Sequence, residues 1–322
     1  MRKEILLDVE GLNIYMKEND QVYQACSEVN LRIPRETTVS IVGESGCGKS
    51  LTCSAVMGLL NPPKWKVEGR MVFEGEPLAV WNDRFMNRIR GNAVSLVAQD
   101  PMSAFDQRMT ILSHFMEIRG NRLKSKKEVL RQAEELLFHM NIRTPKDVLK
   151  CYPFQLSGGM LQRVLIAMAV SASPSLLIAD EPTTALDVTN QQELLHLLKK
   201  MKEEEKLSVL LVSHDLNLIS RMADEMNVMY AGMVVEKGTT HEIMEHPLHP
   251  YTKALLQSRP AFSKKRLPVL EGQPPALAER KRGCPFQCRC SQKKECCQNQ
   301  MPPETEPIPG HFVRCFVEES CC

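Results

Sequence analysis

The fold of this chain is decided by one stretch, Gly43-Glu44-Ser45-Gly46-Cys47-Gly48-Lys49-Ser50, which matches the phosphate-binding pattern G-x-x-x-x-G-K-[ST]. Residues 38–42 in front of it predict a buried strand, and residues 51–60 behind it predict a helix. Glycines at such a junction let backbone N–H groups turn inward around phosphate oxygens, and the helix N-terminus adds the positive end of its dipole.

Lys49 and Ser50 give this loop its chemistry. A lysine here supplies a positive charge to the β- and γ-phosphates, and the serine hydroxyl is a ligand for Mg²⁺. A glycine-rich turn without a ligand would explain the glycines but not the lysine-serine pair. The sequence therefore predicts a nucleoside triphosphate site with its Mg²⁺ ion, contacted by residues 43–50 and by Leu51.

The composition fits one large domain or two moderate ones, with 322 residues, a net charge of +2 and 43% hydrophobic residues. Such a small net charge gives no field that would favour nucleic acid as the main partner. The N-terminus shows no export signal, and the longest uncharged stretch, residues 164–179, is too short and too polar to span a bilayer. We expect a soluble protein of the reducing cytosol that can sit on a membrane partner.

Apolar residues repeat with the period of strands in some segments and with the period of helices in others. We expect β structure over residues 5–33 and a mostly helical insertion over residues 101–172. Strands that alternate with helices predict a doubly wound parallel sheet with its ligand chemistry at the strand C-termini. Further strands are expected at residues 71–73, 93–98, 176–181 and 208–212, a helix at residues 194–201, and a hairpin at residues 226–236 that turns at Ala231-Gly232.

Polar residues end three of the expected strands. Asp180 and Glu181 follow one apolar strand, where Asp180 can hold Mg²⁺ through water and Glu181 can polarise the attacking water as a general base. Gln99 ends a second strand, where it can reach the metal or the water, and His214 ends a third, where it can contact the γ-phosphate. Taken alone, each could be a structural or solvated residue, but their order along the chain favours a function.

A second anion-binding device is predicted at Leu156-Ser157-Gly158-Gly159, where a helix begins. The Ser157 hydroxyl and the N–H groups of Gly158 and Gly159 can face a phosphate there. The alternative is that Ser157 only caps the helix. A cap does not need two glycines, which weaken the first turn of a helix, so the anion-binding interpretation is favoured.

Together these motifs occur in the order of an ATP-binding cassette, and the chain resembles the ATPase subunit of an ABC transporter over about residues 5–258. The resemblance implies an α/β fold, a P-loop NTPase cassette with a parallel core sheet, an N-terminal antiparallel β subdomain and a helical subdomain. It divides the chain into a nucleotide-binding domain, residues 1–258, and a Cys-rich C-terminal extension, residues 259–322. The resemblance rests on Gly43–Ser50, Gln99, Leu156–Gly159, Asp180-Glu181, Ala185-Leu186-Asp187 and His214.

The resemblance also implies how the site works, with ATP and Mg²⁺ as cofactors. It implies a head-to-tail dimer in which the Ser157 loop of one cassette closes over ATP held by the other. Asp187 would lie at the dimer seam, Glu181 would be the catalytic base, and Gln99 would link the site to a membrane subunit. Met160 stands where many cassettes have glutamine, so any side-chain hydrogen bond from that position to nucleotide is lost.

The resemblance narrows to the peptide/nickel importer subclass. Residues 99–104, 152–163 and 249–252 look like that subclass, and so does the tail from Gly283 to Cys315. Members commonly pair two different ATPase subunits beneath two membrane permeases, which an extracytoplasmic substrate-binding protein supplies. We therefore expect a peripheral ATPase at the cytoplasmic face of the cell membrane that drives import of peptides, or of nickel or a chelated metal.

Two other classes of protein share parts of this pattern. A soluble cassette ATPase that acts on nucleic acid or the ribosome usually fuses two cassettes or carries a long coiled coil, and the span between residues 50 and 157 leaves no room for one. An iron–sulfur redox protein would explain the tail but not the complete ATPase set. No residue is assigned to stack on adenine, because Tyr15 and Tyr23 are both plausible and Met16 falls at the aligned position.

The tail holds 8 of the 12 cysteines of the chain. Clustered cysteines in a reducing compartment suggest metal or cluster ligation more than disulfides. The spacing of Cys284, Cys290, Cys297 and Cys315 matches that of the subclass's extension, and four thiolates without histidine suit either a [4Fe–4S] cluster or Zn²⁺. We expect a structural [4Fe–4S] cluster on these four residues, with a disordered tail as the alternative, and free thiols at the two C-terminal cysteines.

Overall fold

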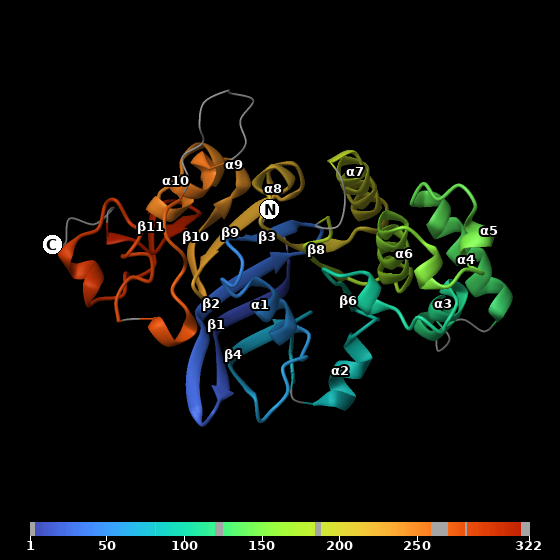
Figure 1. Ribbon diagram of the computed structural model, residues 1–322, viewed down its shortest axis with the longest axis horizontal. Coiled ribbons are helices and arrows are strands. Elements are labelled where there is room, and N and C mark those ends of the chain that lie inside the picture. The colour runs from blue at the N-terminus through green and yellow to red at the C-terminus, as the bar shows by residue number, and fades with distance from the viewer. Residues whose placement is uncertain are drawn as a thin grey trace. The chain divides into compact units, whose positions relative to one another are not determined.

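The computed structural model describes residues 4–80, 82–119, 125–183, 188–258, 270–280 and 282–316. The chain folds as two compact units, one of Met1–Glu4 and Trp81–Leu211 and the other of Ile5–Val80 and Val212–Cys322. Figure 1 labels their helices and strands. Within the described ranges, no helix is both long and apolar enough to cross a membrane.

An antiparallel sheet begins the unit that contains the phosphate loop. Its four strands run in the order β2-β1-β4-β5. In β2 the buried residues Val29, Leu31 and Ile33 alternate with more exposed ones, which confirms the strand expected there. The strands are β1 (Ile5–Glu18), β2 (Gln21–Pro34), β4 (Trp65–Phe73) and β5 (Glu76–Pro77).

The phosphate loop lies between a buried strand and a short helix of the same unit. β3 (Thr38–Val42) is buried at every position, and α1 (Lys49–Val56) follows the loop. The strand is as predicted, but the helix begins at Lys49 and ends before residue 60. It ends because Met57 closes the last turn and Gly58 adopts a left-handed φ of 60°.

The hairpin expected near residue 230 is confirmed. β9 (Glu225–Tyr230) and β10 (Met233–Thr239) pair antiparallel, and β3 pairs in parallel with β9. Ala231 and Gly232, with φ values of 46° and 86°, make a two-residue turn in which both residues have positive φ. A Cβ at Gly232 would lie 2.2 Å from the Ala25 carbonyl oxygen, so only glycine fits there.

The C-terminal extension joins this sheet, whereas the sequence suggested a separate segment. β12 (His311–Val313) pairs antiparallel with β10, and β11 (Thr305–Ile308) pairs with β12. These strands are too short to show a periodic pattern, which is why the sequence did not reveal them. Besides α1, the described residues of this unit form α8 (Leu216–Met222), α9 (Thr240–Glu245) and α10 (Pro250–Gln257), with 3₁₀ turns at Leu277–Glu279 and Glu295–Gln298.

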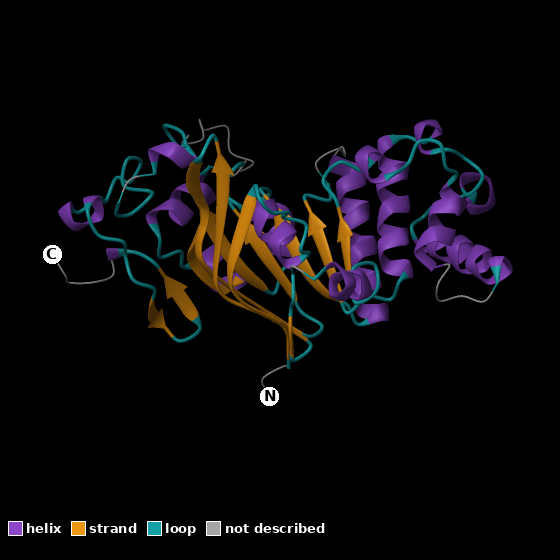
Figure 2. Cartoon of the chain, turned by 90° about the horizontal axis from the view of Figure 1, so that it is seen from below, coloured by secondary structure: helices purple, strands orange, loops and turns teal. Residues whose placement is uncertain are grey.

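The other unit combines parallel strands with the helical insertion (Figure 2). β6 (Val94–Val97) pairs in parallel with β7 (Leu176–Asp180), and β8 (Ser208–Ser213) runs from this unit into the other along the chain. In the insertion, which the sequence predicted to be mostly helical, α4 buries Val129, Ala133 and Leu137. The helices are α2 (Asp83–Ile89), α3 (Ile111–Arg119), α4 (Lys126–His139), α5 (Pro145–Val148), α6 (Gly158–Ser171) and α7 (Val188–Glu205), with 3₁₀ turns at Met102–Ala104 and Pro153–Gln155.

Candidate nucleotide-binding site

Two glycines of the phosphate loop, Gly43 and Gly48, are required by close packing on β9. Gly43 has φ 154° and Gly48 has φ 108°, values that side chains rarely adopt. A Cβ at Gly43 would lie 2.1 Å from the Met229 carbonyl oxygen, and one at Gly48 would lie 2.8 Å from the Met229 Cε and 2.9 Å from the Cys26 Sγ. The loop backbone is therefore held directly against the sheet.

Lys49 lies against the loop itself. Its side chain is buried, and its ammonium group donates hydrogen bonds to the carbonyl oxygens of Gly43 at 2.8 Å and Glu44 at 3.1 Å. Ser45 and Ser50 are exposed. The loop thus presents a buried positive charge and exposed hydroxyl groups, which are the groups that binding of a phosphate with Mg²⁺ requires.

The other predicted residues of the loop have mixed surroundings. The Cys47 side chain is buried, which raises the pKa of its thiol, and its carbonyl oxygen accepts a hydrogen bond from the Gly232 N–H at 2.8 Å. Gly46 is exposed and Leu51 is half-buried. The Cys47 side chain therefore belongs to the core and is not exposed to a ligand.

His214 follows β8, as predicted, and its side chain is exposed. The next residue, Asp215, caps α8 by accepting hydrogen bonds from the N–H groups of Asn217 at 2.8 Å and Leu218 at 3.4 Å. The strand end and the cap fix the backbone on both sides of His214 and leave its imidazole ring accessible.

Two of the predicted catalytic residues meet in the other unit. The Gln99 Nε2 donates a hydrogen bond to the Glu181 Oε2 at 3.1 Å, across 82 positions of the sequence. Glu181 has a φ of 48°, in the left-handed region that a residue with a side chain avoids at some cost. Such strained residues cluster at active sites. Asp180, immediately before it, ends β7 and is half-buried.

Ser157 caps α6. Its Oγ accepts a hydrogen bond from the Met160 N–H at 3.3 Å, so the capping alternative describes a real contact. A Cβ at Gly158 would meet no atom within 4 Å, so packing among the described residues does not require a glycine there. Ser157, Gly159 and Met160 line a cavity of about 1120 Å³ in this unit. Asp187, the other residue predicted at the dimer seam, lies outside the described residues.

The four cysteines predicted as ligands lie in the described part of the tail. Cys284, Cys297 and Cys315 are buried and Cys290 is half-buried, and none of the four forms a disulfide. Burial first, and then the charges of the other three thiols, raise the pKa of the Cys284 thiol to about 12. No group of three His, Cys, Asp or Glu residues in the described chain is arranged to hold a metal ion. The two C-terminal cysteines lie outside the described residues.

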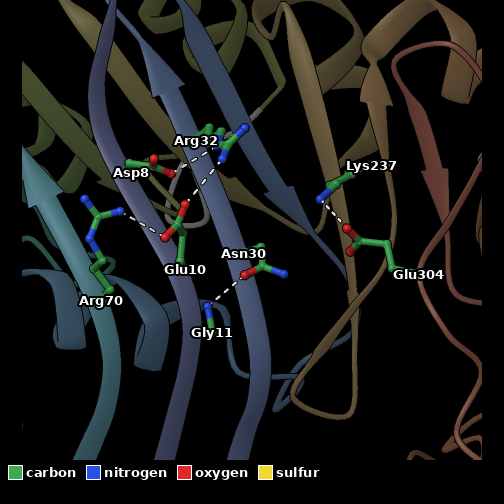
Figure 3. Close-up of polar contacts among 8 residues, drawn as sticks. All are labelled: Asp8, Glu10, Gly11, Asn30, Arg32, Arg70, Lys237 and Glu304. Carbon is green, nitrogen blue, oxygen red and sulfur yellow. Dashed lines mark hydrogen bonds and ion pairs between the residues drawn. The ribbon is translucent and has the colours of Figure 1, made fainter.

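A further cavity, of about 490 Å³, lies in the unit of the phosphate loop. Figure 3 shows that the charged side chains around it pair with one another: Arg32 contacts Asp8 and Glu10, Arg70 contacts Glu10, and Lys237 contacts Glu304. Charged residues of both signs line this cavity, so it lacks the concentration of one charge that would attract a charged ligand.

Sequence reasoning missed two residues that hold the phosphate loop. The Tyr251 hydroxyl accepts a hydrogen bond from the Glu44 N–H at 3.0 Å, and Arg289 binds the Glu44 carboxylate. Arg289 lies 245 positions after Glu44, and no local pattern links two residues so far apart.

Comparison with known proteins agrees with this geometry. The ABC transporter family model matches residues 26–184, and the model of the oligopeptide/dipeptide transporter C-terminal region matches residues 235–297. The first match includes the phosphate loop, the Ser157 motif and Glu181. The second includes Arg289 and three of the four cysteines predicted as ligands.

Relatives match along nearly the whole chain. The dipeptide transport ATP-binding protein DppD of Bacillus subtilis is 39% identical over 320 residues, which cover 98% of this chain and 96% of the relative. DppD of Escherichia coli is 37% identical, with 96% of each chain covered. The oligopeptide transport ATP-binding protein OppD of Bacillus subtilis is 38% identical, with 97% of this chain and 88% of the relative covered.

Solved structures show the same fold. A dimeric ATP-binding cassette in a post-hydrolysis state with ADP and Pi has a TM-score of 0.65 and 27% identity, covering 73% of this chain and 98% of that one. CbiO1 of Clostridium perfringens, part of an ABC transporter complex, also has a TM-score of 0.65, at 25% identity, covering 76% of this chain and 92% of that one. With these structures, two successive family models and relatives along its length, this chain belongs to the ABC transporter family of ATP-hydrolysing subunits, in the group that carries the oligopeptide/dipeptide C-terminal region.

Proposed function

We propose that this chain supplies the energy for an importer of peptides by hydrolysing ATP. The observation that carries the proposal is the phosphate loop with the buried Lys49 ammonium group, in a chain whose relatives along its length are dipeptide and oligopeptide transport ATP-binding proteins. Those names concern peptides, so peptides are preferred over nickel or a chelated metal as the substrate.

The proposed site follows the motifs residue by residue. Lys49 and the loop backbone bind the ATP phosphates, and the predicted Mg²⁺ ligands are Ser50, Gln99 and Asp180. Mg²⁺ would neutralise charge on the phosphates. The nucleotide contacts in the same chain are Gly43, Glu44, Ser45, Gly46, Cys47, Gly48, Lys49, Ser50 and Leu51, and those given to a partner cassette's ATP are Ser157, Gly158, Gly159 and Asp187.

Hydrolysis is proposed to begin with a proton transfer to Glu181. The carboxylate accepts a proton from water as the water oxygen attacks the γ-phosphorus, and the bond to the β-phosphate oxygen breaks. Gln99 donates a hydrogen bond to this carboxylate and so fixes its orientation. His214 is assigned to the γ-phosphate, where its exposed ring can report the loss of that group.

The proposed assembly contains several other subunits. Residues 1–258 are proposed as the nucleotide-binding domain and residues 259–322 as the extension. A second, related but different ATPase subunit would complete each site, beneath two membrane permeases supplied by an extracytoplasmic substrate-binding protein. The chain would then lie peripherally at the cytoplasmic face of the cell membrane, with no role for nucleic acid.

The isolated chain is expected to hydrolyse ATP slowly, because each site needs the Ser157 loop of an opposing cassette. The rate per subunit should rise with protein concentration, or when the partner ATPase subunit is added. Steady-state phosphate release over a range of concentrations measures this. High activity that does not depend on concentration would contradict the shared site.

The transport function is tested on the purified complex in lipid vesicles. Its ATPase rate should increase when the binding protein is loaded with a peptide, and labelled peptide should accumulate inside the vesicles. The same assay with nickel in place of peptide is the matched comparison. Stimulation by nickel alone would replace the peptide assignment, and stimulation by neither would reject both.

We further propose that the tail holds a [4Fe–4S] cluster on Cys284, Cys290, Cys297 and Cys315. Support comes from the spacing of the four cysteines in the sequence and from the burial of Cys284, Cys297 and Cys315. In the described chain these side chains are not yet arranged as a metal site, so binding would require the thiols to lose protons and close in.

Iron near four equivalents and brown visible absorption are therefore expected in protein purified without oxygen. The four-cysteine variant, with each ligand changed to serine, should lack both, while the Cys151→Ser variant is the control. Zinc without iron would reject the cluster, and the absence of both metals would reject ligation.

A further inference from the structure

The C-terminal extension contacts the phosphate loop through Arg289. The Nη1 of Arg289 lies 2.6 Å from the Glu44 Oε2, and its Nη2 lies 3.0 Å from the Glu44 Oε1, so the guanidinium group binds the carboxylate with two parallel hydrogen bonds. The Arg289 side chain is only 4% exposed and that of Glu44 is 28% exposed. Glu44 is the second residue of the loop, and both residues belong to the same compact unit.

Three polar groups of Glu44 are engaged by three different parts of the unit. Its N–H donates to the Tyr251 hydroxyl at 3.0 Å, its carbonyl oxygen accepts from the Lys49 ammonium group at 3.1 Å, and its carboxylate binds Arg289. The residue that positions the Lys49 charge is thus itself held by the extension. A change in the Glu44 side chain would move the carbonyl oxygen that Lys49 contacts.

Arg289 is held in place independently of Glu44. Its Nε donates to the Glu271 carbonyl oxygen at 3.0 Å, and its Nη1 donates to the Tyr230 hydroxyl at 3.3 Å. The guanidinium carbon lies 5.8 Å from the centre of the Tyr230 ring. These contacts fix the orientation of the guanidinium group before it meets the carboxylate, so the pair is better organised than a mobile surface ion pair.

The extension does not depend on Arg289 for its attachment. β12 pairs with β10, and the Phe286 ring packs against Tyr230 and Tyr251 at centroid distances of 5.2 and 5.4 Å. Arg280 donates to the Ala25 carbonyl oxygen at 2.9 Å. Because these contacts remain when Arg289 is changed, the variant is expected to keep the extension in place.

We propose that Arg289 is a positioning residue for the phosphate loop, through which the C-terminal extension sets the affinity of the loop for nucleotide. The proposal rests on the assignment of residues 43–50 as the ATP site. Because Arg289 contacts the Glu44 carboxylate, its proposed action is on the conformation of the loop and not on the chemical step. The alternative is that the ion pair only stabilises the fold and does not affect nucleotide affinity.

The test is the nucleotide affinity of the full-length Arg289→Ala variant, measured by calorimetric titration with ADP and with ATP and Mg²⁺. Its Kd is expected to rise about tenfold, within the usual range of coupling between linked sites. In the assembled ATPase, KM for ATP should rise while kcat changes little, as for a loss of ground-state binding. Arg289→Lys keeps the charge but loses the paired geometry, so it should give an intermediate Kd.

A double-mutant cycle with Glu44→Gln separates positioning from stability. If Arg289 acts through Glu44, the Kd of the double variant should be no higher than the Kd of Arg289→Ala alone, because both changes remove the same ion pair. The matched control is Arg314→Ala, which removes another mostly buried arginine of the extension, one that pairs with Glu304 at 3.5 Å. It should leave the nucleotide Kd unchanged within about twofold, whatever it does to the melting temperature.

Two results would overturn the proposal. One is a lower melting temperature for Arg289→Ala with an unchanged nucleotide Kd, and the other is a double variant whose loss of affinity is the product of two independent losses. Titration of Lys49→Ala in the same experiment distinguishes a failure of the Arg289 proposal from a failure of the ATP site assignment. If Lys49→Ala bound nucleotide like the natural chain, the ATP site assignment would fail, and the role of Arg289 with it. If Arg289→Ala does not fold, the Kd of Arg289→Lys decides.

Discussion

Replacing Glu181 with glutamine is expected to lower the ATP turnover of the assembled complex by roughly 100- to 10,000-fold, the usual contribution of a general base. The amide keeps the size of the side chain and can keep a contact with Gln99, now 3.1 Å from the carboxylate, but it cannot accept a proton from water. ATP should still bind, because the phosphate contacts are assigned to other residues. The variant would therefore accumulate in an ATP-bound state.

Single-turnover phosphate release and nucleotide binding on the same preparation measure this prediction. Glu135→Gln is the matched control, because Glu135 lies on the exposed face of α4, where its Oε2 pairs with Arg131 at 3.4 Å. It should leave turnover unchanged. Full turnover in Glu181→Gln would reject Glu181 as the base, and a loss of binding equal to the loss of turnover would make it a binding residue.

The sequence predicted those parts of the site that short segments determine. Residues 43–50 form a contiguous motif whose glycines, lysine and serine each have a chemical reason to be there, and β3 and the start of α1 follow from the flanking apolar pattern. The turn at Ala231-Gly232 was likewise predicted, because glycine favours the positive φ that such a turn needs, although Ala231 adopts a positive φ as well.

Contacts between distant segments could not be predicted in this way. The pairing of β12 with β10 and the ion pair of Arg289 with Glu44 each join the tail to much earlier residues, and neither leaves a local pattern. The end of α1 was misjudged for a different reason. Apolar residues continue past Val56, but Gly58 takes a left-handed φ that stops the helix.

The sequence pattern and the structure each explain only part of the Ser157 motif. The structure has Ser157 as a helix cap, and it leaves Gly158 with open space around the position of a Cβ. The cap accounts for the serine and leaves Gly158 without a structural requirement. The proposed ligand of the Gly158 and Gly159 N–H groups is the ATP of a partner cassette, which a single chain does not contain.

Replacing Lys49 with alanine should instead abolish tight nucleotide binding. The ammonium group now donates to the Gly43 and Glu44 carbonyl oxygens, so its charge is placed inside the loop before any phosphate arrives. Without it, the phosphates would lose a buried cationic donor, and the two carbonyl oxygens would lose their hydrogen bonds. The Kd for ATP is expected to rise on the order of 100-fold, as for truncation of one partner of a buried charge pair.

Calorimetric titration with ATP measures the loss of affinity. The melting temperature without nucleotide shows whether the variant is folded, so that a loss of affinity is not mistaken for unfolding. Lys49→Met, of similar length and without charge, should lose nearly as much affinity, because the charge and not the alkyl chain is the required group. Lys237→Ala is the control in the same unit, since Lys237 pairs with Glu304 at 2.8 Å. Retention of tight ATP binding by both Lys49 variants would reject residues 43–50 as the ATP site. In that case the assignment of Lys49, which distinguishes this loop from an ordinary glycine-rich turn, would be wrong.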